Sequence, residues 1–136
     1  MRNTKRVSDP SLLLMPLEQL LISLVETSPL RLTLCHVGLT AEVWGDAHLY
    51  VETDWLTIVI GEKLNRLHVR RAALQRAQFI DVWGREKAVH FVDDAERLVL
   101  RSVLVDTAED TERHVPARLA AFLALQKQYG EGIRLQ

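Results

Sequence analysis

Three basic side chains, Arg66, His68 and Arg70, alternate with two apolar ones, Leu67 and Val69, near the middle of this chain. Successive side chains of a β-strand point to opposite faces, so this spacing predicts a strand with the basic groups on one face and the apolar ones in the core. An imidazole flanked by two guanidiniums can hold an iron together with two carboxylates, which is the combination that haem presents. The alternative interpretation is a solvent-facing polar strip of an antiparallel sheet.

Other residues could support the same chemistry. His90 lies between apolar residues of a second predicted strand and is the fallback metal ligand. Trp55 and Trp83 stand at strand ends, where an indole can line a flat apolar ligand or fill the core. Arg71 is expected on the opposite face of its strand and ranks below the other two arginines as a carboxylate partner. His48, near a predicted turn, is expected to be merely exposed.

The bulk composition describes one compact domain. The chain has 136 residues, 48% of them hydrophobic and 26% charged, with a formal net charge of −1. This balance gives no electrostatic case for nucleic acid as a partner, and the apolar runs are too short for membrane insertion. Cys35 stands alone, which excludes an internal disulfide, and we expect a cytoplasmic protein. No P-loop, GxGxxG or GxSxG motif is present.

The patterning predicts an α+β protein with a helix at each end of a run of strands. Helical spacing indicates a first helix from Pro16 to Thr27 and a last one from about Pro116, with Gly130 as its C-cap. Antiparallel strands are predicted at 30–36, 39–44, 47–53, 55–60, 64–70, 77–83, 87–92 and 97–105. Residues 1–8 are expected to be a flexible N-terminus, and residues 9–136 a single domain.

Three stretches resemble the bacterial haem-utilisation proteins of the HemS, ChuX and HutX type. WLTIVIGEKLNRLHVRRAAL is similar to that family's Trp-Leu-Asn and Asn-Leu-His-Leu-Arg run, with Trp55, Leu56, His68 and Arg70 in register. KAVHFVDDAERLVLRSVL resembles its strand, acidic turn and next strand, and VPARLAAFLAL resembles its closing helix. The resemblance covers about three quarters of the chain.

The resemblance implies a curved antiparallel sheet of about eight strands flanked by the two helices, commonly assembled as a homodimer. It also implies an intracellular protein that binds haem on one side of the sheet and carries, stores or delivers it for its iron. In that interpretation His68 (or His90) binds the iron, Arg66 and Arg70 pair with the propionates, and Trp55 and Trp83 form apolar walls.

Two other functions stay open. At places where the family commonly has further histidines this chain has Asp54, Ile60 and Lys87, which favours a non-haem dimeric interaction or small-ligand module on the same fold. The third possibility is a haem-degrading enzyme that takes electrons from an external donor, because the chain has no flavin or nicotinamide motif. Whether the protein is an enzyme is left open by the sequence.

Overall fold

The computed structural model describes residues 5–6, 16–82, 86–104, 115–130 and 132–135. Within this part, two α-helices, a 3₁₀ turn and ten strands follow one another along the chain. They are β1 (Lys5–Arg6), α1 (Pro16–Val25), β2 (Leu30–His36), β3 (Leu39–Gly45), β4 (Ala47–Val51), β5 (Trp55–Ile60), β6 (Asn65–Arg70), η1 (Arg71–Ala73), β7 (Arg76–Val82), β8 (Glu86–Val92), β9 (Leu98–Leu104), α2 (Val115–Tyr129) and β10 (Gly132–Arg134).

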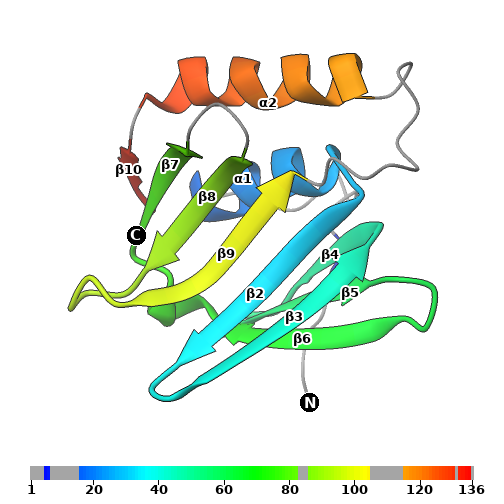
Figure 1. Ribbon diagram of the computed structural model, residues 1–136. Helices are drawn as coiled ribbons and strands as arrows, with labels where there is room; N and C mark the ends of the chain where they lie inside the picture. Colours follow the sequence, from blue (N-terminus) through cyan, green and yellow to red (C-terminus); the bar gives the residue numbers. More distant parts are fainter. Residues whose placement is uncertain (1–4, 7–15, 83–85, 105–114, 131, 136) are drawn as a thin grey trace.

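The strands form two antiparallel sheets (Figure 1). The smaller has the order β1-β4-β5-β6, and the larger has the order β10-β7-β8-β9-β2-β3. The predicted α+β class is confirmed, and each of the eight predicted strands is present. They divide over two sheets, however, because the chain leaves β3, the edge of the larger sheet, and enters β4 of the smaller one through Gly45 and Asp46. The two short strands β1 and β10 were not predicted from the pattern.

The two sheets approach each other closely where Gly45 meets Gly61. A Cβ placed on Gly45 would lie 2.6 Å from the Cα of Gly61, and one placed on Gly61 would lie 2.8 Å from the Trp44 carbonyl oxygen. Both glycines also have positive φ angles, +132° and +85°. Since a side chain fits neither the space nor the backbone conformation, glycine is required at this crossing.

Helix α1 supplies one stripe of leucines to the core. Leu17, Leu20, Leu21 and Leu24 recur at helical spacing and are all buried. The helix packs against β4 and ends at Val25, two residues earlier than predicted, where the hydroxyl of Thr27 donates to the Leu24 carbonyl at 2.6 Å.

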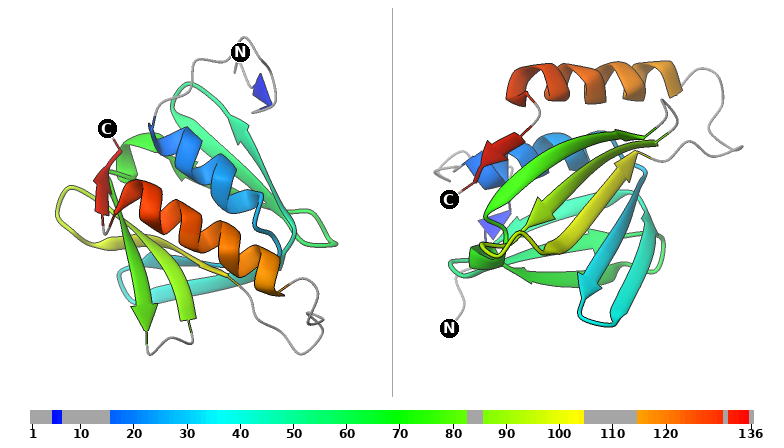
Figure 2. Two further views of the ribbon diagram at one scale, coloured as in Figure 1. Left: turned by 90° about the horizontal axis from the view of Figure 1, so that it is seen from above. Right: turned by 60° about the vertical axis from the view of Figure 1, so that its left-hand side comes forward.

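Helix α2 lies alongside α1 and covers the larger sheet (Figures 1 and 2). Its Arg118 donates to the carbonyl oxygens of Thr27 (3.1 Å) and Pro29 (2.7 Å), at the end of α1. Its Phe122 contacts Phe79 of β7 edge to face, with 5.7 Å between ring centroids. A single hydrophobic core therefore joins both helices and the inner faces of both sheets.

No helix in the described part of the chain is long and apolar enough to cross a membrane.

Candidate functional site

The outer face of the smaller sheet carries the basic groups that the sequence singled out. In β6, Leu67 and Val69 are buried, while Arg66, His68 and Arg70 are exposed. The predicted alternation is therefore confirmed, with the apolar side chains in the core shared by both sheets. We call the outward side of β4, β5 and β6 the site face; its side chains are His48, Tyr50, Trp55, Thr57, Val59, Arg66, His68 and Arg70.

Strand register arranges these side chains in rows across the sheet. His48 lies opposite Val59, which lies opposite Arg66. The next row has Tyr50 opposite Thr57, which lies opposite His68, and the last pairs Trp55 with Arg70. His68 is thus flanked by one arginine on each side, each two residues away along the strand, or about 7 Å.

The site face is hollowed over its first two rows. The hollow has a volume of about 550 Å³, within the range of about 300–1,000 Å³ usual for small-molecule pockets. It is lined by His48, Tyr50, Glu52, Thr57, Val59, Leu64, Arg66 and His68. Groups that can bind a metal, donate to an acid or contact an apolar ring are therefore gathered in one concave place.

One ring nitrogen of His68 is engaged by the sheet, and the other has no hydrogen-bond partner among the described residues. Nδ1 lies 2.9 Å from the hydroxyl oxygen of Thr57, a buried residue directly opposite on β5. No described residue hydrogen-bonds to Nε2. When Nδ1–H donates to Thr57, Nε2 carries the lone pair, and a ligating histidine is commonly oriented in this way by its other ring nitrogen.

The arginine that follows the site strand is half-buried and points toward α1 rather than onto the site face. Arg71 forms an ion pair with Glu18 of α1, whose side chain is only 2% exposed. It also donates to the Thr53 carbonyl oxygen at 3.2 Å. This placement off the site face agrees with the expectation from the alternation, since Arg71 follows Arg70 by one residue.

The other sequence candidates lie elsewhere. His90 stands in β8 of the larger sheet, and its Nε2 accepts a hydrogen bond from Nε of Arg101 at 3.1 Å. The structure does not bring it to the hollow that His68 lines. Trp83 lies outside the described residues. Trp55 does lie on the site face, beyond the lining of the hollow and in contact with Arg70.

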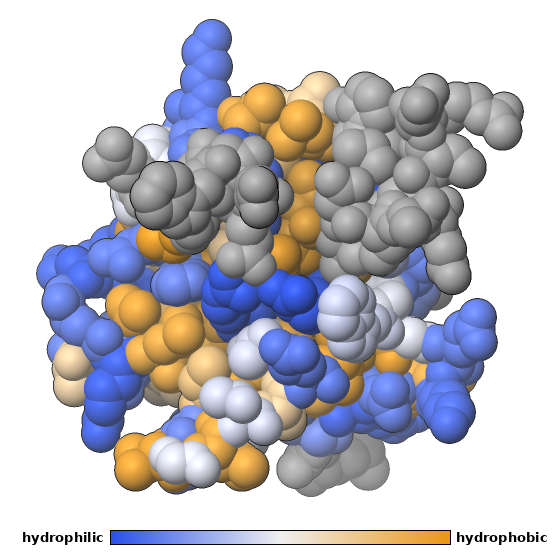
Figure 3. All heavy atoms as spheres, viewed as in Figure 1, coloured by the Kyte–Doolittle hydropathy of each residue, from blue (hydrophilic) through white to orange (hydrophobic). Residues whose placement is uncertain are grey.

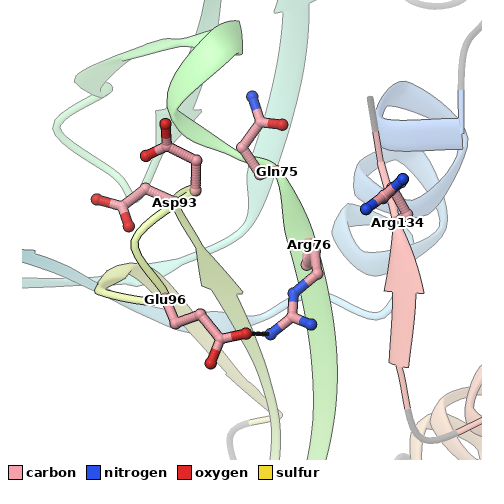
Figure 4. Close-up of a pocket in the computed structure, with 6 residues that line it drawn as sticks. Gln75, Arg76, Asp93, Glu96 and Arg134 are labelled. Atoms are coloured by element: carbon pink, nitrogen blue, oxygen red, sulfur yellow. Dashed lines mark hydrogen bonds and ion pairs between the residues drawn. The ribbon is translucent and has the colours of Figure 1, made fainter.

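A second hollow, of about 340 Å³, lies near β7 and the turn between β8 and β9 (Figure 4). It is lined by Gln75, Arg76, Asp93, Asp94, Glu96 and Arg134. Arg76 is already paired with Glu96, and the backbone N–H groups of Arg97 and Ala95 donate to Asp93 at 2.9 Å. The hydrogen bond from Arg97 does most to lower the pKa of Asp93 below its ordinary value. With three carboxylates for two arginines, this hollow suits an acidic ligand less well than the first.

Sequence reasoning missed the contribution of β4 to the site. His48 was expected to be merely exposed, and Tyr50 and Glu52 were not considered, yet all three line the hollow with His68. The signal was present, because His48 and Tyr50 alternate with Ala47, Leu49 and Val51, the pattern of a strand with one polar face. Among the described residues, no three histidine, cysteine or acidic side chains lie close enough together to hold a bare metal ion.

Comparison with known proteins supports the fold. No protein-family model and no curated protein matches the chain. Among solved structures it is similar to the crystal structure of ChuX, with a TM-score of 0.66 and 10% sequence identity over 93% of this chain and 76% of that chain. The ChuX-like fold implied by the sequence resemblance is thus confirmed.

Proposed function

We propose that this protein binds haem on the site face, with His68 as the iron ligand and Arg66 and Arg70 paired with the propionates. The observation that carries the proposal is the hollow itself, in a ChuX-like fold. It is lined by His68, with a free Nε2, and by Arg66, while the exposed Arg70 follows His68 on the same face just beyond the hollow. The donor set fits the ligand, because guanidinium forks match carboxylates and neutral imidazole binds iron.

Bound haem would supply the iron and a flat apolar ring. The chain's own residues would bind and orient it. Thr57 fixes the ring orientation of His68, and Val59 and Leu64 give the hollow its apolar surface. An open site on one sheet face suits a carrier that hands its ligand on, so we place the protein in intracellular haem iron utilisation.

The test is a hemin titration of the purified protein, followed by visible absorption, in parallel with two histidine variants. His68→Ala is expected to abolish the shift of the Soret band, and saturation in the wild type is expected near one haem per chain. His90→Ala is the matched control, since it removes an imidazole from the other sheet. An unsaturable response that is the same in all three proteins would contradict the proposal.

A second candidate is a dimeric interaction module, favoured by the outer edge of the larger sheet. Among the described strands β3 pairs with β2 alone, and five of its seven residues are exposed. Three large apolar side chains in β3 and the turn before it have high exposed fractions: Val37 (82%), Leu39 (66%) and Trp44 (51%). Exposed edge strands pair readily with another chain. In the view of Figure 3, by contrast, hydrophilic residues cross the middle of the molecule, over β9 and β2 of the larger sheet.

Light scattering across a concentration series tests this candidate. A homodimer through β3 is expected to dissociate in Leu39→Glu, whereas Leu123→Glu, a change of an exposed leucine on α2, should leave it intact. A monomeric wild type would refute the dimer.

A further inference from the structure

Trp55 and Arg70 form a cation–π pair at one end of the site face. They lie opposite each other in register on β5 and β6, and the Arg70 guanidinium carbon is 4.8 Å from the centre of the indole ring. A guanidinium held face-on to an aromatic ring keeps its N–H groups at its edge, where they can still donate to a carboxylate.

The strand ends that carry this pair are tied together. The N–H of Glu52 donates to the carbonyl of Trp55 at 2.8 Å, which closes the turn between β4 and β5. The N–H of Arg71 donates to the carbonyl of Asp54 at 2.9 Å, which joins that turn to the end of β6. The buried ion pair of Arg71 with Glu18 then fixes this junction to α1. The pair therefore stands on a rigid part of the fold.

The other arginine of the site face has no such support. Arg66 lies opposite Val59, near the exposed Leu64, and no aromatic ring of the described residues contacts it. A long, mobile side chain loses more conformational entropy when it binds a ligand than one already held in place. The two flanking arginines are thus unequal.

We propose that Trp55 is a positioning residue, which holds Arg70 as the main recognition group for a carboxylate of the ligand. This inference rests on the proposed function in taking the ligand to be an acidic porphyrin. It assigns Trp55 a role different from the apolar wall expected from sequence, because its effect acts through the charge of Arg70 rather than through contact with the ring.

The experiment compares four porphyrins in one mild detergent: hemin, metal-free protoporphyrin, and the dimethyl ester of each. Binding of the metal-free pair is followed by porphyrin fluorescence and reports the carboxylates without iron ligation. The ratio of the two dissociation constants, ester over acid, measures acid recognition. In the wild type this ratio is expected to be about tenfold or more, as for a charged hydrogen bond.

Trp55→Leu is expected to lower this ratio by about two- to fivefold, the equivalent of a cation–π contact. Trp55→Phe should restore part of it, because an aromatic face remains. Arg70→Gln should remove most of the acid preference, and Arg66→Gln, at the arginine without an aromatic neighbour, should lower it by less. Thermal unfolding of each variant checks that the fold is intact.

The outcomes separate this inference from the proposed function. Equal weakening of acid and ester by Trp55→Leu would overturn the inference and make Trp55 a wall. A third outcome is an acid preference that is lost in the Trp55 and Arg70 variants, while His68→Ala binds hemin as the wild type does. This result would support the inference and overturn the assignment of His68 as the iron ligand. A wild type that binds none of the four porphyrins would overturn both.

Discussion

The ion pair between Glu18 and Arg71 gives the sharpest prediction for stability. The Glu18 side chain is 2% exposed and its Oε2 has no hydrogen-bond partner, so Arg71 is what compensates its charge among the described residues. Replacing Arg71 with methionine leaves a buried carboxylate unpaired. We expect the free energy of unfolding to fall by about 3–5 kcal/mol, as for other buried pairs broken on one side.

Replacing Glu18 instead of Arg71 should lower the free energy of unfolding by less, because Glu18 is the more deeply buried partner. Arg71 is 25% exposed and keeps its hydrogen bond to the Thr53 carbonyl. We therefore expect Glu18→Leu to lower the free energy of unfolding by about 1–3 kcal/mol. The double variant should recover most of the loss of Arg71→Met, since well-packed apolar residues often replace a buried ion pair without cost.

Urea unfolding of the wild type and the three variants, followed by circular dichroism, measures these differences as a double-mutant cycle. Additive effects would show that the two side chains are not coupled. A larger loss for Glu18→Leu than for Arg71→Met would refute the argument from unequal burial.

Three further predictions concern single positions. Gly61→Ala should lower the free energy of unfolding by about 2 kcal/mol or more, and Gly38→Ala by only about 1 kcal/mol. Both glycines have a positive φ, but only Gly61 is crowded by neighbouring atoms. Thermal unfolding of the two variants measures the difference. Thr57→Val should weaken hemin binding about tenfold by freeing the His68 ring, and a visible titration tests this. The lowered pKa of Asp93 gives stability above its ordinary value of 3.8 that is lost as pH falls through the folded-state value. The difference in melting temperature between wild type and Asp93→Asn should therefore shrink in acid, and equal differences at pH 7 and pH 2 would contradict it.

Local patterns were sufficient to predict both helices, the strands β2 to β9 and the polarity of β6. Alternation placed His68 outward and Val69 inward because the period of a strand depends only on the chain's own geometry. The same rule put Arg71 off the site face, where it is found.

Relations between elements were harder to predict. The pairing of β4 with β5 brings Tyr50 into the row of His68, and it depends on tertiary contacts that no single stretch encodes. The predicted strands 39–44 and 47–53 leave a break between them, but nothing local says that the chain changes sheets there. The partner of Arg71, Glu18, lies on a helix far away in sequence, so only the packed structure reveals it.

The side chains of the site face come from one unbroken stretch, residues 48 to 70, and from a single meander of three strands. Within each of these strands, alternate side chains pack in the core and those between them lie on the site face. A lineage could therefore exchange one ligand for another by successive point substitutions in a short gene segment, without disturbing the core. On this view one architecture can serve more than one function, and a protein with a ChuX-like fold can have a different ligand.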